Sequence, residues 1–415
     1  MKMSNAPVIA VIGAGASGLM AALSAANEAS VINKKIRIVM FDGNSRVGKK
    51  LLVTGNGRCN LTNLNMDTSF FYGSQRLFNE VCRQFDNYAL IDFFASIGLA
   101  VKSDLAGRVY PLSNQASSVL DALRFEMQKR DIEFVPENKI TSIKRSGGGF
   151  LLNGSFFADK CILACGGCAG FVHGSDGSGY ELLRELGIGV TEVFPALNAL
   201  EIAGFTKSLK GIRAEGEISV KNAGKLLSSK RGELQYADYG ISGIPAMQVS
   251  RFAAGILNGG APFVSVYIDS VPSMSREQLT VFIEKTIKNN PALPCEMLLA
   301  GLMPKKLGAY LLSDISINPS KCVSVLNKAV ISKIADSVKS KKYKVTGVKG
   351  FADAQVTAGG VPEYELIPGT LETKKIKGLY VCGELADVDG DCGGYNLQWA
   401  FSSGHVAGMN AVRGI

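Results

Sequence analysis

The sequence is poor in the residues that usually mark metal centres, hydrolytic triads and disulfide frameworks. Its 415 residues include two histidines, His173 and His405, so no Ser/His/Asp triad can be nominated. The nine cysteines are a sparse, odd-numbered set that suits a reducing compartment better than a disulfide framework. Cys165 and Cys168 form a CxxC pair without a second pair, so we expect no metal site. Packing is the default role for this pair, and a redox disulfide is the alternative.

Long apolar stretches are also absent, and we expect no leader segment. No run of about 18 uninterrupted apolar residues occurs, so we expect no membrane-spanning helix. The first residues reach a glycine-rich turn after one short apolar run, without the charged region and cleavage site of a signal peptide. We therefore expect a cytoplasmic protein. Apolar residues at 47% and charged residues at 20% indicate an ordinary globular composition.

The chain carries a net charge of +9, but its basic residues are scattered. The densest run, Lys339 to Lys344, is short and contains a single aromatic residue, Tyr343, which favours a solvated loop or helix end over a nucleic-acid patch. We therefore expect no nucleic-acid partner. A basic surface would also steer small anionic molecules toward the protein.

A strand, a tight turn and a helix are predicted near the start of the chain. The apolar run Val8 to Ile12 leads into glycines 13, 15 and 18 and then into a segment rich in alanine and leucine. In this spacing Gly13 makes the turn, Gly15 lets the backbone approach a pyrophosphate, and Gly18 lets helix and strand pack closely. The pattern predicts a dinucleotide-binding site, with a purely structural glycine turn as the alternative.

A second buried strand, Ile36 to Phe41, follows the helix and ends at Asp42. A carboxylate at the end of this strand can accept hydrogen bonds from ribose hydroxyls. The two strands and their helix form a βαβ unit, which predicts an α/β fold with a doubly wound parallel sheet.

The residues after Asp42 favour FAD over NAD. Residues 46–63 are unusually dense in glycines, amides and cations, whereas a nicotinamide dehydrogenase would proceed to its next βα unit. A long polar loop suits a cofactor whose second half extends deep into the protein, with cations near phosphates or a flavin anion. The alternative is an ordinary surface loop.

The end of the chain returns to the dinucleotide fold. The strand Gly378 to Gly383 leads to Glu384, whose carboxylate can bond the ribityl hydroxyls of a flavin. The segment after Gly393 opens a helix whose backbone N–H groups could stabilise negative charge on the flavin N1/O2 edge. That is how a protein favours a reduced, anionic flavin.

The length of the chain predicts more than one lobe, since single cores stop growing at around 250–300 residues. We expect one helix over Asn79 to Ile97, short β-like runs from Pro195 to about Val271, and helices broken by prolines from Met274 to Val338. The expected domains are residues 1–195 and 363–415 for the FAD-binding domain, 196–273 and 339–362 for a β-rich substrate lobe, and 274–338 for a helical cap.

Several segments together resemble a known family. VIGAGASGL, GNGRCNLTN, GRVYPLSNQASSVLDAL, VTAGGV and GLYVCGELADVDGDCGGYNLQWAFSSGHVAG occur in that order. They resemble the bacterial BaiN/aminoacetone-oxidase-like family of FAD-dependent NAD(P)H oxidoreductases, and the resemblance extends from about Val8 to Ala411. It implies a split Rossmann-type FAD-binding domain, an inserted β-rich, barrel-like lobe and a small helical cap.

The resemblance also carries cofactor contacts onto this sequence. It implies contacts from Gly13, Gly15, Gly18, Asp42, Lys50, Arg58, Asn60, Gly383, Glu384, Asn396, Leu397 and Gln398. We expect their neighbours at the cofactor as well: Ala16, Ser17, Gly43, Leu51, Gly57, Cys59, Ala164, Cys165, Gly166 and Gly394. Asp42 departs from the family's more usual glutamate but keeps the carboxylate.

Three residues are candidates for catalysis. Arg58 would lie near the flavin or an anionic substrate, Tyr239 could supply a proton, and Asp238 could hold a substrate hydroxyl or amine. Asp238 and Tyr239 stand where many family members have histidine and phenylalanine, and both could equally be ordinary interface residues. The substrate is expected beside the flavin, near residues 238–243 and 356–360.

The expected activity is hydride exchange at flavin N5 with a small or medium organic substrate. Two directions stay open: NAD(P)H-dependent reduction of an enone C=C bond, or oxidation of an amine by O₂. No second GxGxxG unit occurs, so NAD(P)H would dock only transiently. Other classes are a flavin-dependent RNA-modifying enzyme and a non-catalytic FAD-binding protein. The sequence leaves the oligomeric state open.

Overall fold

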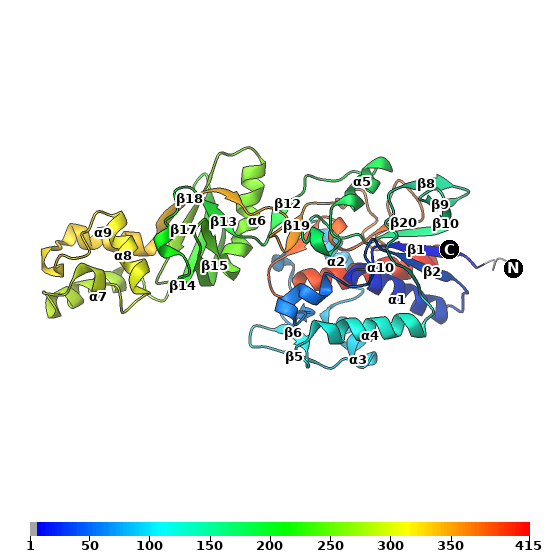
Figure 1. Ribbon diagram of the computed structural model, residues 1–415, viewed down its shortest axis with the longest axis horizontal. Helices are drawn as coiled ribbons and strands as arrows, with labels where there is room; N and C mark the ends of the chain where they lie inside the picture. The colour runs from blue at the N-terminus through cyan, green and yellow to red at the C-terminus, as the bar shows by residue number, and fades with distance from the viewer. Residues whose placement is uncertain (1–5) are drawn as a thin grey trace. The chain divides into compact units, whose positions relative to one another are not determined.

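A computed structural model describes residues 6–415 of the protein. It divides into two compact units: unit 1 contains the chain up to Phe194 together with Gln355–Ile415, and unit 2 is Pro195–Ala354. Unit 1 is therefore assembled from both ends of the chain, and unit 2 is inserted between them (Figure 1). This confirms the expected α/β fold class with a split Rossmann-type domain.

The core of unit 1 is a five-stranded sheet in the order β20-β11-β1-β2-β7, in which neighbouring strands are parallel. The strands are β1 (Val8–Ile12), β2 (Arg37–Phe41), β7 (Glu133–Val135), β11 (Lys160–Leu163) and β20 (Leu379–Val381). Ile12 pairs with both Leu163 and Phe41, and Leu163 pairs with Val381. The carboxyl ends of four strands therefore meet at one edge, where ligands bind in open α/β sheets.

Two long helices join the two ends of the chain in unit 1, and they lie side by side in Figure 1. They are α1 (Ala16–Val31) and α10 (Tyr395–Arg413). An ideal Cβ on Gly404 would lie 2.3 Å from the Ser17 carbonyl oxygen, and one on Gly408 would lie 2.1 Å from that of Ala21. These two contacts show that the helices run parallel, and α10 begins about 12 Å before the start of α1, at 1.5 Å per residue.

The rest of unit 1 is made of short elements around this sheet. The helices are α2 (Gln75–Cys82), α3 (Asn87–Ser96), α4 (Ala116–Lys129) and α5 (Ser178–Glu185). The strands are β3 (Thr62–Asn63), β4 (Phe71–Gly73), β5 (Val101–Ser103), β6 (Arg108–Pro111), β8 (Ile143–Ser146), β9 (Gly149–Leu152), β10 (Phe156–Ala158), β19 (Val356–Ala358) and β21 (Val388–Gly390); β12 (Phe194–Ala196) lies where the chain passes into unit 2.

One helix prediction in this unit was wrong. The segment expected to form a single helix from Asn79 to Ile97 contains the end of α2 and the whole of α3. Asp86 separates them, because its side chain accepts a hydrogen bond from the Ala89 N–H at 2.8 Å and caps the start of α3.

Unit 2 contains a closed barrel in the order β13-β16-β15-β14-β17-β18. Its strands are β13 (Leu200–Ile202), β14 (Arg213–Asn222), β15 (Lys225–Tyr236), β16 (Gly240–Ser242), β17 (Val264–Asp269) and β18 (Lys341–Val348). Alternate residues of β17, Val264, Val266 and Ile268, are buried, as expected for a strand with one face on a core. The expected barrel-like lobe is confirmed.

A helix inside this lobe was missed by the sequence analysis. The residues from 195 to 271, expected to be mostly β, include α6 (Ile244–Asn258). Proline stands in its first turn, where the missing N–H costs nothing, and Ala246, Val249 and Ala253 are buried at helical spacing.

Three further helices lie between β17 and β18: α7 (Arg276–Asn289), α8 (Lys305–Asp314) and α9 (Lys328–Lys339). As expected, Pro291, Pro294, Pro304 and Pro319 fall outside them. The helices share one apolar core with the barrel, in which Leu307 and Leu311 belong to the same cluster as Val345. Within residues 6–415, no helix combines the length and hydropathy needed to cross a membrane.

Candidate functional site

The glycine turn after β1 leaves open space at the start of α1. Gly13 has a φ of +102°, and an ideal Cβ there would lie 2.4 Å from the Ala164 carbonyl oxygen. A Cβ on Gly18 would lie 1.9 Å from the Gly13 oxygen, whereas a Cβ on Gly15 would meet nothing within 4 Å. Gly15 is also the N-cap of α1 and has no side chain to cap it. The first-turn N–H groups of α1 are thus left for an anionic ligand.

Asp42, at the end of β2, holds the glycine turn and the following loop with one carboxylate. Its Oδ2 accepts a hydrogen bond from the Ala14 N–H at 2.7 Å, and its Oδ1 accepts from the Asn44 N–H at 2.7 Å. The Asn44 side-chain amide also donates to Oδ1 at 2.9 Å. The sequence analysis missed Asn44, although an amide two residues after a strand-end aspartate is a signal for such a turn.

The polar loop that follows is strained and carries an unsatisfied oxygen. Asn56 and Cys59 have φ values of +55° and +60°, which are uncommon for residues other than glycine. Asn60 Oδ1 is buried and has no hydrogen-bond partner within residues 6–415. An ideal Cβ on Gly394 would lie 2.9 Å from this oxygen, so it stands beside the start of α10. A buried acceptor without a partner at this position fits a bound cofactor.

The neighbouring side chains of this loop differ in exposure. Leu51 and Cys59 are buried, and burial raises the pKa of the Cys59 thiol to about 12, so the thiol is neutral. Arg58 is exposed; its Nε donates to the Gly55 carbonyl at 3.2 Å, and its guanidinium lies 4.6 Å from the centroid of the Tyr110 ring. The flavin or substrate contact expected of Arg58 stays a prediction.

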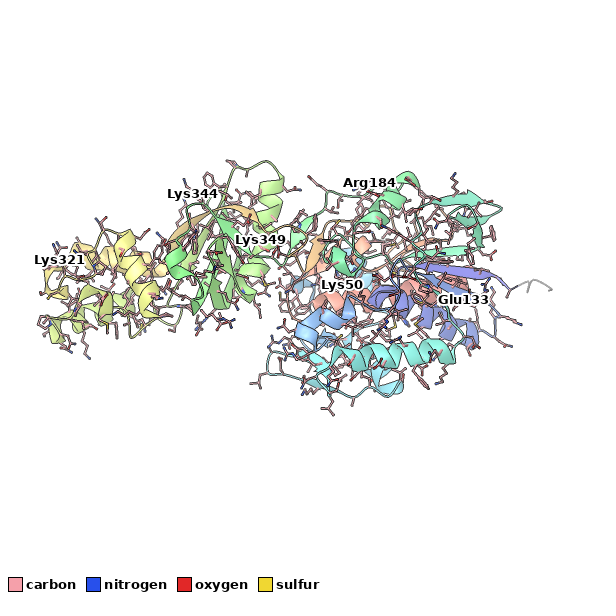
Figure 2. The ribbon with its side chains drawn as sticks, in the orientation of Figure 1. Lys50, Glu133, Arg184, Lys321, Lys344 and Lys349 are labelled. Carbon is pink, nitrogen blue, oxygen red and sulfur yellow. The ribbon has the colours of Figure 1, made fainter. Side chains whose placement is uncertain are left out.

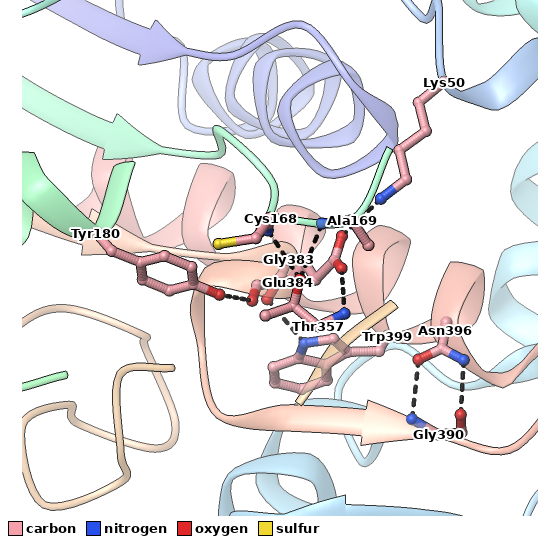
Figure 3. Close-up of polar contacts among 10 residues, drawn as sticks. All are labelled: Lys50, Cys168, Ala169, Tyr180, Thr357, Gly383, Glu384, Gly390, Asn396 and Trp399. Atoms are coloured by element: carbon pink, nitrogen blue, oxygen red, sulfur yellow. Dashed lines mark hydrogen bonds and ion pairs between the residues drawn. The ribbon is translucent and has the colours of Figure 1, made fainter. Parts of the chain in front are cut away.

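Lys50 and Glu384 form an ion pair that joins the two ends of the chain (Figure 3). Lys50 Nζ lies 2.9 Å from Glu384 Oε2, and Glu384 Oε1 accepts a hydrogen bond from the Thr357 N–H at 2.7 Å. Thr357 Oγ1 in turn accepts from the N–H groups of Cys168 and Ala169 at 2.8 and 3.1 Å. Glu384, expected to bond a ribityl chain, therefore already has protein partners on both oxygens, and Thr357 was missed.

The turn at Gly383 is fixed by three side chains around it. Its carbonyl accepts a hydrogen bond from Trp399 Nε1 at 2.9 Å, and its N–H donates to Ser403 Oγ at 2.9 Å. The Tyr180 hydroxyl donates to the Glu384 carbonyl at 2.9 Å (Figure 3). These bonds hold the strand end rigidly against α10.

Two polar side chains at the start of α10 form hydrogen bonds with other groups of the protein. The Asn396 amide accepts from the Gly390 N–H at 2.8 Å and donates to the Gly390 carbonyl at 2.7 Å (Figure 3). Gln398 is fully buried and donates to Ser402 Oγ at 2.8 Å. Leu397 is half-buried. The backbone N–H groups of this segment could still contact a cofactor, and the contacts expected of Asn396, Leu397 and Gln398 stay predictions.

The remaining cofactor candidates also lie in unit 1. An ideal Cβ on Gly383 would lie 2.5 Å from Ser17 Oγ, so the first and last cofactor motifs are in contact. The others lie in the first turn of α1, after β2, in the polar loop and after β11: Ala16, Gly43, Gly57, Cys165 and Gly166.

The CxxC pair is not activated. Cys165 and Cys168 are both free, and burial raises the pKa of both thiols, that of Cys165 to about 12. Because the thiolate is the reactive form, this favours packing over redox chemistry. Within residues 6–415, no cluster of three or more His, Cys, Asp or Glu side chains could hold a metal ion.

Asp238 and Tyr239 lie in unit 2, between β15 and β16. Asp238 Oδ2 lies 2.7 Å from Lys210 Nζ, and this hydrogen bond holds the pKa of the Asp238 carboxyl below its ordinary value. Lys349 Nζ lies 4.2 Å from the centroid of the Tyr239 ring and 3.1 Å from Glu201 Oε1. The catalytic roles of Asp238 and Tyr239 stay predictions.

A split Rossmann sheet, an open helix start at a glycine turn, a strand-end carboxylate and an orphaned amide oxygen together define a dinucleotide-binding protein of the flavoprotein class. The residues from 7 to 410 match the family described as HI0933-like protein Rossmann domain. The chain belongs to this family of FAD-binding Rossmann proteins, which confirms the family resemblance.

Named relatives match over nearly the full length. The chain is 39% identical to 3-dehydro-bile acid delta(4,6)-reductase of Clostridium scindens, over 97% of this chain and 98% of that protein. It is 27% identical to ribosomal RNA dihydrouridine synthase of Escherichia coli, over 97% of each chain. The protein is thus an FAD-dependent oxidoreductase.

Solved structures share the fold. The open conformation of a flavocytochrome c3 fumarate reductase superposes with a TM-score of 0.50 at 15% identity, covering 100% of this chain and 79% of that one. 3-Ketosteroid delta1-dehydrogenase from Sterolibacterium denitrificans superposes with a TM-score of 0.50 at 11% identity, covering 98% and 99%. At these identities the likeness concerns the fold alone.

Proposed function

We propose that the protein is an FAD-dependent reductase that adds hydride to a C=C bond conjugated to a carbonyl in a small or medium organic molecule, with NAD(P)H as a transient electron donor. The observation that carries this proposal is the 39% identity to a reductase over 97% of the chain. The names of both relatives, a delta(4,6)-reductase and a dihydrouridine synthase, describe the saturation of a C=C bond, which favours reduction over amine oxidation.

Unit 1 supplies the groups that would hold FAD. Bound FAD would supply hydride transfer at N5. The open start of α1 would bind the pyrophosphate, and Asp42 would accept a hydrogen bond from a ribose hydroxyl on Oδ2, which has one protein donor where Oδ1 has two. The N–H groups at the start of α10 would stabilise negative charge on the isoalloxazine, and Asn60 Oδ1 would accept a hydrogen bond there.

For the substrate we propose Tyr239 as the proton donor and Asp238 as a polar contact. A phenolic hydroxyl can both donate and accept a hydrogen bond, which suits the role proposed for Tyr239. Arg58 is proposed to attract an anionic substrate, since its guanidinium is exposed.

Anaerobic stopped-flow spectroscopy tests the proposed function. NADPH or NADH should bleach the flavin absorbance, and a steroid 4-en-3-one or a simple enone should restore it faster than air does. Bleaching by a primary amine, with rapid reoxidation by O₂, would instead identify an amine oxidase. A flavin that neither nicotinamide nor amine reduces would leave only the non-catalytic alternative.

An RNA substrate is a second candidate, because one argument against it was wrong. The sequence analysis found no stripe of alternating basic and aromatic residues, but in the barrel the ammonium groups of Lys221 and Lys342 lie 4.7 and 5.9 Å from the centroid of the Tyr267 ring. Lys344, labelled in Figure 2, lies 5.1 Å from the Phe263 ring. Lysines interleaved with aromatic rings are typical of surfaces that bind single-stranded nucleic acid.

Salt-dependent retention of RNA separates the two candidates. If RNA is the substrate, the protein should bind ribosomal RNA at low salt with an affinity that falls steeply with salt concentration. The slope of log affinity against log salt concentration reports the number of phosphates that the protein neutralises. Replacing Lys221, Lys342 and Lys344 with glutamine should then reduce that number by up to about three. Absence of binding at low salt would remove this candidate.

A further inference from the structure

His173 has a ring nitrogen that the protein itself does not satisfy. The residue ends a short 3-10 turn, Phe171–His173, between Gly170 and Gly174, both of which have positive φ. Its Nδ1 is buried and has no hydrogen-bond partner within the part of the chain that the structure describes. Burying a polar nitrogen without a partner is unfavourable, so such a group in a folded protein calls for a ligand.

One side of this turn contacts the residues that hold Asp42. The Asn44 side-chain amide donates to the His173 carbonyl at 3.4 Å and to Asp42 Oδ1 at 2.9 Å. An ideal Cβ on Gly174 would lie 2.4 Å from the same amide nitrogen. The turn is therefore packed against the strand end where the adenosine ribose is expected.

The other side of the turn contacts Lys50. An ideal Cβ on Gly170 would lie 3.4 Å from Lys50 Cε and 3.8 Å from His173 Cδ2, so the lysine stem and the imidazole flank the same point. Lys50 in turn holds Glu384, the carboxylate on the flavin side of the site. His173 thus stands between the ribose end of the cofactor site and its flavin end. In an extended dinucleotide the group between these ends is the pyrophosphate.

We propose that His173 Nδ1–H donates a hydrogen bond to the pyrophosphate of the bound dinucleotide. The proposal deepens the proposed function and rests on it for the presence of FAD. The bond would be charge-assisted, and Lys50 would share the neutralisation of the phosphates with the open start of α1. His173 would then act only in binding, in the ADP half of the cofactor.

The test compares dissociation constants of cofactor-stripped protein for FAD, ADP and riboflavin, by fluorescence quenching and calorimetry. His173→Ala should weaken binding of FAD and ADP about tenfold or more and leave riboflavin unchanged, because riboflavin has no phosphate. His173→Asn should recover part of the loss, since its amide can donate from nearly the same position. Val172→Ala is the matched control, because this neighbour is 60% exposed and should change nothing.

Three outcomes would overturn the inference. They are unchanged FAD and ADP affinities in His173→Ala, an equal loss in Val172→Ala, or a loss for FAD without a loss for ADP, which would place His173 at the flavin. Circular dichroism of each variant establishes that it is folded. Wild-type protein that binds no FAD would defeat the proposed function itself, whereas wild-type binding with an unaffected His173→Ala defeats only the role of this histidine.

Discussion

Replacing Thr357 with valine should weaken both the stability of unit 1 and its hold on FAD. Thr357 is 1% exposed, and its Oγ1 is the acceptor for the N–H groups of Cys168 and Ala169 at 2.8 and 3.1 Å. Valine keeps the shape but leaves both donors buried and unbonded. Each such donor costs about 1–3 kcal/mol, and because the bond at 3.1 Å is the weaker, we expect a total loss of about 2–4 kcal/mol.

The structure also says why FAD binding should suffer. The Thr357 N–H donates to Glu384 Oε1, and this bond is independent of the side chain. The two N–H groups that lose their acceptor, however, belong to the segment after β11, and this segment lies beside the Glu384 carboxylate (Figure 3). If that segment shifts, the Lys50–Glu384 pair loses its fixed position, so FAD should dissociate more readily.

Trp399 provides the assay for stability. It is the single tryptophan of the chain, is 2% exposed and lies in unit 1, so its fluorescence in urea reports the unfolding of the unit that contains Thr357. Thr357→Ser is the matched control, because it keeps the oxygen and loses only one buried methyl group, worth about 0.8 kcal/mol. A valine variant as stable as the serine variant, with the same FAD affinity, would refute the reasoning.

Four further variants test the site, and a fifth tests a buried histidine in α10. Glu384→Ala should weaken FAD retention by about 1.5–3 kcal/mol, measured by cofactor release on dilution, and unchanged affinity would place the ribityl contact elsewhere. Arg58→Lys should keep the fold but alter turnover or the flavin spectrum, since a planar fork is not replaced by a point charge; wild-type kinetics and spectra would reduce it to a scaffold. Tyr239→Phe and Asp238→Asn should lower kcat with FAD content intact, and unaltered kcat/KM in both would remove them from the site. Burial lowers the pKa of His405 to about 4 from an ordinary 6.5, so the unfolded chain binds the proton more tightly than the folded protein does. The free energy of unfolding should therefore fall by roughly 3 kcal/mol as the pH drops from about 6.5 to about 4. His405→Gln should flatten that part of the pH profile measured by urea denaturation, and an unchanged profile would contradict this prediction.

The parallel sheet of unit 1 could be predicted because its central strands are short runs of mostly buried, apolar residues. Val8–Ile12 has the bounds that the sequence indicates, and the second strand, expected from Ile36 to Phe41, spans Arg37–Phe41. The glycine spacing was equally informative, because a side chain on Gly13 or Gly18 would clash with nearby backbone atoms. Those atoms lie within a few residues in the chain or just after the adjacent strand. Such signals are local, and local signals can be read from one sequence.

The barrel and its helix were harder to predict for different reasons. Closure of the barrel depends on pairs such as β13 with β18, which are far apart in the chain and leave no local signature. The helix α6 was missed because its apolar residues, read in short stretches, look like the β runs around it. Only the spacing of Ala246, Val249 and Ala253 over the whole segment distinguishes the two.

Glu384 shows most clearly where reading the cofactor site from sequence stops. Its position after a strand predicts a carboxylate at the cofactor, and in the structure it lies beside Lys50 and Thr357. Its ion pair with Lys50, however, joins residues 334 positions apart, and the bonds from Thr357 to the segment after β11 span 189 and 188 positions. A sequence motif identifies each polar group but does not identify its hydrogen-bond partners. If Glu384 contacts FAD as proposed, its ion pair with Lys50 would also fix that lysine, so the loss of Glu384 should disturb the cation as well as the ribityl contact.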